Sequence, residues 1–158
     1  MQSTQKTEVS IINALRSKGY KATPQRIAVC KIALGSPEHP SVQKIYTAVK
    51  KTNPTVSLAT VYSTLNILKD SGLIQELNFP KGQTRYDPYL EPHINLICLQ
   101  CGKIQDLDDQ ASKELVKKAT GKVQFTPSGQ RIDIYGTCEY CAKGKLTKKP
   151  QRTSQSDL

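Results

Sequence analysis

Residues 57–87, SLATVYSTLNILKDSGLIQELNFPKGQTRYD, decide the fold of the N-terminal half of this chain. Ser57 is a favourable N-cap, and the apolar residues that follow it recur every three or four positions up to Gly72. This spacing predicts one amphipathic helix that ends at the glycine. Beyond it, residues 73–79 and 84–86 form two short β-like runs that a Pro-Lys-Gly turn separates. We therefore expect a helix followed by a β-hairpin.

The spacing also assigns two faces to this helix. The positions expected to face the core are Leu58, Val61, Tyr62, Leu65 and Leu68. The positions expected on the opposite face are Thr60, Ser63, Thr64 and Ile67.

Three further helices are predicted upstream of residue 57. The first is predicted from the apolar residues around Leu15 and ends at Gly19, and Thr23 and Ser41 are the expected N-caps of the other two. Helices followed by a hairpin are typical of a winged helix-turn-helix, whose last helix enters the major groove of DNA. The alternative is a helical domain with an unrelated hairpin.

Positive charge is distributed unevenly along the 158 residues, whose net charge is +10. Residues 1–90 contain 12 Lys and Arg against 5 Asp and Glu, whereas residues 91–141 contain 6 against 7. We predict a DNA-binding domain at 1–88, a second domain at 89–141 and a basic, disordered tail at 142–158. The excess positive charge favours a polyanionic partner.

Nothing in the sequence predicts a membrane segment. No apolar run approaches the roughly 18 residues that a spanning helix needs, and the polar N-terminus lacks a hydrophobic signal region. We therefore expect a cytoplasmic protein without a membrane partner.

Four cysteines form the strongest local signal. They stand as two pairs, Cys98-x-x-Cys101 and Cys138-x-x-Cys141. Two residues between thiolates let both sulfurs of a tight turn reach one ion, so two such turns complete a tetrahedral, structural Zn²⁺ site. Disulfides or redox motifs are the competing interpretations, and a reducing cytoplasm disfavours them. Cys30 stands apart and is expected to be a small core residue.

The region around the cysteines predicts a small mixed domain. Residues 109–119 have a helical pattern, and residues 93–99, 103–107 and 130–135 have strand patterns. Exposed strand edges would allow pairing across a two-fold axis, which gives the homodimer that half-site DNA recognition needs. The expected fold class is therefore α+β: an N-terminal winged helix-turn-helix and a C-terminal α/β dimerisation domain with a four-cysteine zinc site.

Several short motifs occur together in one order, and they extend over about residues 10–141. They are Ala22-Thr-Pro-Gln-Arg26, His39-Pro40, Ser57-Leu-Ala-Thr-Val-Tyr62, Arg85-Tyr-Asp87, Cys98-Leu-Gln-Cys-Gly-Lys103 and Ile134-Tyr-Gly-Thr-Cys138. In this combination the chain resembles the ferric uptake regulator superfamily. The resemblance implies a homodimeric, metal-dependent transcriptional repressor that binds an A·T-rich palindromic DNA duplex and is not an enzyme.

The resemblance also implies a second, regulatory site for Fe²⁺ or Mn²⁺. The positions that match the ligands of the peroxide-responsive branch are His39, Asp87, His93, Asn95 and Asp106. Asn95 departs from the usual pattern, which has histidine there; its neutral carbonyl oxygen suits a hard or borderline ion and binds more weakly than imidazole. Asp106 favours the peroxide-responsive branch, because iron-sensing members more often have Glu at this position.

The resemblance implies DNA contacts as well. Tyr62 matches a residue that touches thymine, and Lys21 matches one that enters an A·T-rich minor groove. Arg26, Thr60 and Ser63 are expected to contact or position phosphates.

Three alternatives remain open at this point. The nearest is a regulator of the same superfamily that senses iron or manganese abundance. The others are a metal-dependent enzyme that uses His39, Asp87, His93 and Asp106, and a zinc-ribbon interaction module in which these residues are incidental.

Overall fold

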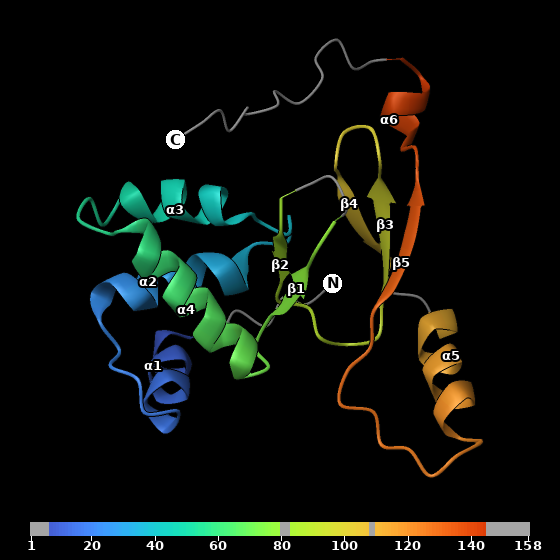
Figure 1. The fold of residues 1–158 in the computed structure, drawn as a ribbon, viewed down its shortest axis with the longest axis horizontal. Helices are drawn as coiled ribbons and strands as arrows, with labels where there is room; N and C mark the ends of the chain where they lie inside the picture. Colours follow the sequence, from blue (N-terminus) through green and yellow to red (C-terminus); the bar gives the residue numbers. More distant parts are fainter. Residues whose placement is uncertain (1–6, 80–82, 108–109, 145–158) are drawn as a thin grey trace, which may run out of the picture. The chain divides into compact units, whose positions relative to one another are not determined.

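The computed structural model describes residues 7–79, 83–107 and 110–144, and the chain divides between Leu90 and Glu91 into two compact units (Figure 1). Unit 1 contains α1 (Glu8–Ser17), α2 (Pro24–Gly35), α3 (Val42–Lys50), α4 (Leu58–Asp70), β1 (Gln75–Leu77) and β2 (Arg85–Asp87). Unit 2 contains β3 (Ile94–Cys98), β4 (Ile104–Leu107), α5 (Gln110–Thr120), β5 (Ile132–Gly136) and α6 (Glu139–Ala142).

Some sequence-based expectations lie outside the described residues. They concern the turn at 80–82, the start of the fifth helix at 109 and the tail beyond 144. Within the described ranges, no helix has the length and apolar character to cross a membrane.

Hydroxyl side chains begin the four helices of unit 1. Thr23, Ser41 and Ser57 cap α2, α3 and α4 as predicted, and Thr7 caps α1. Each hydroxyl accepts a hydrogen bond of 3.0–3.3 Å from the backbone N–H three residues further on. Such a cap contributes about 1 kcal/mol, so the starts of these helices are fixed by local sequence.

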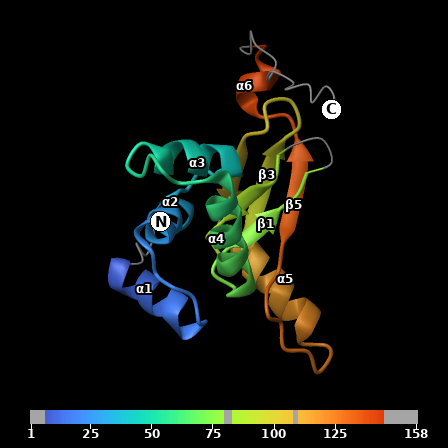
Figure 2. The same ribbon diagram turned by 60° about the vertical axis from the view of Figure 1, so that its left-hand side comes forward.

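The core of unit 1 forms around α2, which packs against α1, α3 and α4 (Figure 2). The side chains at its centre are at most 1% exposed, among them Val29, Ala33, Ile45, Val49 and Leu65.

The orientation of α4 differs from the prediction at three positions. Thr64 and Ile67 were expected outside but are buried, whereas Tyr62, expected inside, is 48% exposed. The Thr64 hydroxyl donates to the Thr60 carbonyl at 2.7 Å, which satisfies this polar group within the helix and permits its burial. Ile67 lines a small cavity together with Ile11 of α1. The buried face of α4 is therefore wider than the spacing of its apolar residues predicted, and Tyr62 lies outside that face.

The hairpin of unit 1 extends onto the segment before α3. β1 and β2 pair antiparallel, and an isolated antiparallel bridge joins Ser41 to Arg85. The Tyr86 N–H also donates to the Pro40 carbonyl at 3.1 Å. The N-cap residue of α3 and the proline before it are thereby held against β2.

Unit 2 contains a three-stranded sheet in the order β4-β3-β5. β3 pairs antiparallel with β4 and parallel with β5, so Asn95 of β3 lies opposite Asp106 on one side and Asp133 on the other. The three strands and α5 were predicted, but the short helix α6 within the second cysteine pair was not. Helices and sheet together confirm the α+β class.

We expect truncation of the α4 core contact to unfold unit 1 selectively. Leu65→Ala should lower the free energy of unfolding by about 2–5 kcal/mol, because it leaves a cavity in a fully buried site. The control is Asn66→Ala, at the next residue of α4, which is exposed. It should change the free energy of unfolding by less than about 0.5 kcal/mol. Urea denaturation followed by far-UV circular dichroism measures both, and equal midpoints would contradict the assigned packing of α4.

Candidate metal centre

The four paired cysteines of unit 2 form one cluster. Their sulfur atoms all lie within 4.8 Å of one another, with Sγ–Sγ distances of 3.6 Å between Cys98 and Cys141 and 3.7 Å between Cys101 and Cys138. Four thiolates around Zn²⁺ at about 2.3 Å stand about 3.8 Å apart along the edges of the tetrahedron. The cluster therefore has the dimensions of a structural zinc site, as its spacing predicted.

The backbone around Cys98 prepares its sulfur for a metal. The Cys138 N–H donates to Cys98 Sγ at 3.3 Å. Burial raises the pKa of the Cys98 thiol, but hydrogen bonds from the backbone of Cys138, Cys101 and Gln100 outweigh burial and lower this pKa to about 6. A thiolate at this position is therefore favoured at neutral pH, and the thiolate is the metal-binding form.

Cys30 has a different environment. Its side chain is fully buried on α2 within the apolar core of unit 1. Burial raises the pKa of its thiol to about 12, against a smaller opposing effect of Arg26. The thiol is therefore protonated and inert, consistent with its expected role as a core residue.

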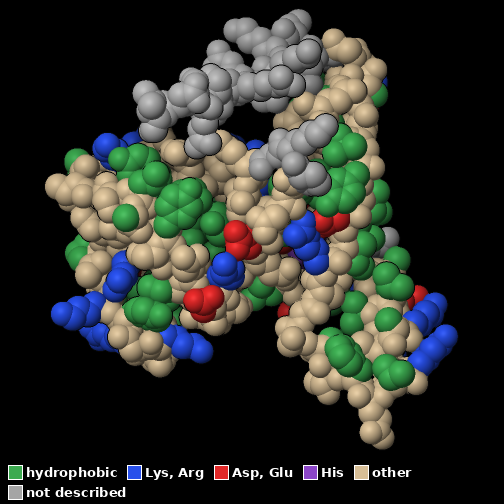
Figure 3. All heavy atoms as spheres, viewed as in Figure 1, with side chains coloured by type: hydrophobic (Ala, Val, Ile, Leu, Met, Phe, Trp, Pro, Cys, Tyr) green, Lys and Arg blue, Asp and Glu red, His purple; other side chains and the backbone are tan. Residues whose placement is uncertain are grey.

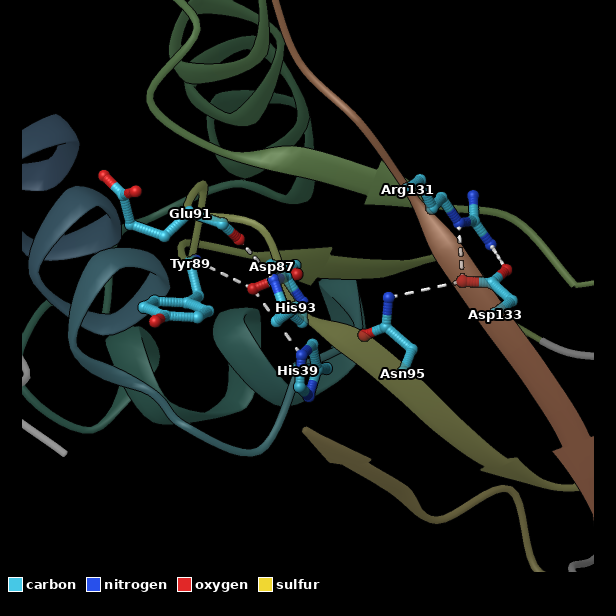
Figure 4. Close-up of polar contacts among 8 residues, drawn as sticks. All are labelled: His39, Asp87, Tyr89, Glu91, His93, Asn95, Arg131 and Asp133. Atoms are coloured by element: carbon cyan, nitrogen blue, oxygen red, sulfur yellow. Dashed lines mark hydrogen bonds and ion pairs between the residues drawn. The ribbon is translucent and has the colours of Figure 1, made fainter. Parts of the chain in front are cut away.

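Unit 1 brings two of the expected regulatory ligands together. The Ser41–Arg85 bridge sets an antiparallel register, and continuing it by two residues on each strand places His39 opposite Asp87. His39 Nε2 lies 3.5 Å from Asp87 Oδ1, and both side chains are at most 2% exposed. The carboxylate also accepts from the Tyr89 N–H at 2.8 Å (Figure 4).

The backbone at His39 is strained. Its φ is +47°, the only positive value at a non-glycine residue among the described parts of the chain. A residue other than glycine adopts this region at a cost of about 1–3 kcal/mol, and such strain clusters at functional sites. Hydrogen bonds fix the backbone directly after His39: the Tyr86 N–H donates to the Pro40 carbonyl, and the Lys44 N–H donates to Ser41 Oγ.

Unit 2 holds the other three expected ligands on one face of its sheet. His93 immediately precedes β3 and Asn95 is the second residue of that strand, so the alternation of the strand, continued by one residue, places both on the same side; Asp106 lies directly across from Asn95 on β4. His93 Nδ1 contacts the Glu91 carbonyl at 2.7 Å. A carbonyl only accepts, so Nδ1 carries the proton, and the neutral ring then presents its lone pair at Nε2.

Sequence reasoning missed a fourth polar residue on this face, Asp133 of β5. Its Oδ1 accepts from Asn95 Nδ2 at 3.2 Å, and Arg131 and Tyr135 donate to the same carboxylate (Figure 4). Burial raises the pKa of Asp133, but the hydrogen bonds from Arg131 and Tyr135 dominate and hold it below its usual value. The alternation Arg131-x-Asp133-x-Tyr135 is the sequence signal that would have placed the three residues on one face of a strand.

The donor set of these residues fits a divalent cation. Imidazole nitrogen, carboxylate oxygen and amide oxygen together suit Mn²⁺ or Fe²⁺. Asn95 is 1% exposed, and its Oδ1 has no hydrogen-bond partner among the described residues. A buried oxygen without a donor is costly in a protein alone, and a bound cation would remove that cost.

The residues expected to contact DNA all belong to unit 1. Tyr62 and Ser63 are exposed on α4, and Thr60, near its N-terminus, shares a 2.8 Å hydrogen bond with the hydroxyl of Ser57. Lys21 is exposed before α2, and Arg26 donates to the Lys21 carbonyl at 3.1 Å. Lys21 and Arg26 therefore form one basic group, and the other three residues form a second group on α4.

Comparison with known proteins defines the class of this protein. Residues 17–135 match the model of the ferric uptake regulator family, and the chain belongs to this family. It is 35% identical over 130 residues to the peroxide-responsive repressor PerR of Staphylococcus aureus strain USA300, covering 82% of this chain and 88% of that protein.

Solved structures agree with this assignment. The Campylobacter jejuni peroxide stress regulator matches with a TM-score of 0.69 and 36% identity, over 83% of this chain and 98% of that one. The Helicobacter pylori ferric uptake regulator Fur, whose structure has three functional metal-binding sites, matches with a TM-score of 0.73 and 27% identity, over 87% and 95% of the two chains. The resemblance found in the sequence is thus confirmed.

The cysteine cluster gives a direct prediction. Cys141→Ser should lose the zinc and destabilise unit 2, because removing one of four thiolates breaks a closed site. Cys30→Ala is the matched control and should retain one equivalent of zinc, since Cys30 lies outside the cluster. Elemental analysis of both purified variants, together with thermal unfolding, measures this. Equal zinc content in the two variants would contradict the assigned cluster.

Proposed function

We propose that the protein is a homodimeric, metal-dependent DNA-binding repressor of the cytoplasm, which senses peroxide through a regulatory Fe²⁺ or Mn²⁺ site. The observation that carries this proposal is the geometry of the two ligand groups: the buried His39–Asp87 pair, and the face of His93, Asn95 and Asp106. The similarity to the peroxide-responsive repressor of S. aureus supports the same assignment.

In this proposal the five residues bind one ion together. Two ligands come from unit 1 and three from unit 2, so occupancy favours one arrangement of the two units over others. The arrangement that binds the ion best is the one that binds the operator, and by linkage the ion strengthens DNA binding. The zinc cluster stays closed throughout and stabilises unit 2.

Peroxide sensing would depend on the two histidines. The imidazoles of His39 and His93 would help to hold Fe²⁺, and the redox chemistry of that ion with hydrogen peroxide would supply the oxidant that adds one oxygen atom to a ligand ring. His39 and His93 are the only histidines in the chain, and both belong to the proposed ligand set. An oxidised ring binds the cation more weakly, so the arrangement that binds DNA loses its stabilisation.

DNA recognition is assigned to unit 1. The exposed phenol of Tyr62 on α4 would contact a thymine in the major groove, and Lys21 would enter an A·T-rich minor groove. Arg26, Thr60 and Ser63 would contact or position phosphates.

The homodimer is assigned to unit 2. Hydrophobic side chains lie at the surface of the part that contains α5 (Figure 3). The large exposed ones in unit 2 are Leu99, Leu107, Leu115, Val123, Phe125, Ile134, Tyr135 and Tyr140. A second copy of the chain would cover part of this apolar surface, and a symmetric dimer matches a palindromic operator.

A second candidate function follows from Asn95. An amide replaces a nitrogen ligand there, which favours a weaker, oxygen-rich site and a regulator that senses manganese or iron abundance. The two candidates differ in one respect only: whether peroxide damages the site.

The test measures binding of the zinc-loaded protein to a palindromic promoter duplex at fixed salt. We expect Mn²⁺ and Fe²⁺ each to support binding, and peroxide to abolish only the Fe²⁺ complex, with one added oxygen atom on a peptide that contains His39 or His93. Asp87→Ala should lose the metal response and keep its zinc, because it removes a ligand in unit 1 alone.

The outcomes of this test separate the candidates. Metal-dependent binding with intact histidines after peroxide would identify a sensor of metal abundance. Binding that ignores the metal would refute the regulatory site, and turnover of a substrate by the isolated protein would indicate a metal-dependent enzyme instead.

We also expect the tyrosine of α4 to contribute to operator affinity. Tyr62→Ala should weaken specific binding by about 1–3 kcal/mol, because it removes an exposed side chain assigned to a base contact. Val9→Ala, which truncates an exposed side chain on α1 of the same unit, is the control. Fluorescence anisotropy with operator and scrambled duplexes measures both, and an equal loss on the two duplexes would contradict base recognition by Tyr62.

A further inference from the structure

The orientation of the Asn95 amide is fixed by its partner. The two ends of an asparagine side chain have similar shape, so hydrogen bonds must decide which end is nitrogen. Here the partner is the Asp133 carboxylate, which only accepts, and the contact of 3.2 Å must therefore involve the amide NH₂. The amide oxygen is then turned away from Asp133 (Figure 4).

Asp133 is itself held in place from two sides. Arg131 Nε donates to Asp133 Oδ1 at 3.0 Å while its Nη2 donates to Oδ2, and the Tyr135 hydroxyl donates to Oδ2 at 2.9 Å. Asp133 and Tyr135 alternate along β5 and Arg131 immediately precedes the strand, and the register places Asp133 beside Asn95. A bidentate guanidinium contact restricts the carboxylate strongly, and the restriction passes to the Asn95 amide.

We propose that Asp133 is a positioning residue for the regulatory ion, which holds the Asn95 amide so that only Oδ1 can coordinate. This inference rests on the proposed function. Without the carboxylate the amide can rotate by half a turn and present its NH₂ group, which repels a cation. With the carboxylate, the buried Asn95 Oδ1 already has the orientation of a ligand before the ion binds. Binding then carries no entropic cost for ordering this side chain.

The Asn95–Asp133 pair also explains how a neutral amide can act as a ligand at a position where the family usually has histidine. The carboxylate accepts from the amide and polarises it, which places more negative charge on Oδ1. A residue behind a metal ligand typically changes metal affinity by about 10–100-fold. Asp133 would thus recover part of the affinity that an amide lacks, and it would do so with an oxygen ligand that suits Mn²⁺.

The sharpest variant is Asp133→Asn, which keeps the shape of the side chain. Arg131 Nε donates at the position of Oδ1, and Arg131 Nη2 and the Tyr135 hydroxyl donate at the position of Oδ2, so either orientation of the new amide sets its NH₂ group against an Arg131 donor and breaks the bidentate contact. The new side chain then no longer holds the Asn95 amide in one orientation, and Asn95 can turn its NH₂ group towards the ion. We expect the Mn²⁺ dissociation constant of the zinc-loaded protein to rise at least about tenfold in calorimetric titration.

Two further variants make the test specific. Glu114→Gln removes one carboxylate from exposed α5 in the same unit and should leave the Mn²⁺ affinity unchanged. Asn95→Ala removes the ligand itself, and in that background Asp133→Asn should have little additional effect, because the positioned group is absent. Zinc content and thermal unfolding without Mn²⁺ report whether each variant is folded.

Each result decides the inference. A tenfold loss in Asp133→Asn that disappears in the Asn95→Ala background supports it. Unchanged affinity in Asp133→Asn overturns the inference and leaves the proposed function intact. An equal loss in both backgrounds shows that the carboxylate acts only through its charge, which also overturns it. Failure of the zinc-loaded, unmodified protein to bind Mn²⁺ or Fe²⁺ refutes the proposed function, and this inference with it.

Discussion

The order of unit 2 depends on the gathering of four thiol groups from two distant turns. Cys98 ends β3, and a single residue, Thr137, separates the end of β5 from Cys138, so closing the cluster draws the ends of these strands together. The strands are parallel and paired from Ile94–Ile132 to Cys98–Gly136. A parallel pair has no tight turn to set its register, and the cysteine cluster supplies the missing constraint.

In unit 1, backbone pairing and not a metal cluster brings distant parts of the sequence together. His39 and Asp87 are far apart in the sequence, and the Ser41–Arg85 bridge brings them together by continuing the hairpin onto the segment before α3. The capping hydroxyl of Ser41 begins the helix at the same point. Residues 39–41 thus pair with β2, begin α3 and include the strained His39. Substitutions in this segment would affect both the fold and the proposed ligand.

The sequence predicted those features whose causes are local. Helix starts follow from the caps at Thr23, Ser41 and Ser57, and the cysteine cluster follows from its spacing. The burial of Thr64 was not predictable from hydropathy, because a hydrogen bond within its own helix satisfies the hydroxyl. The Asn95–Asp133 contact was out of reach for another reason: it depends on the register of two parallel strands 38 residues apart.

The register between β3 and β5 limits where the chain can accept insertions and deletions. Side chains alternate between the two faces of a strand, so a shift of one residue exchanges every side chain of β5 from one face to the other. Asp133 would then exchange places with its apolar neighbours Ile132 and Ile134. Between β5 and the second cysteine pair, insertions or deletions of single residues should therefore be selected against in related sequences, whereas changes in the long connection before Arg131 should be tolerated.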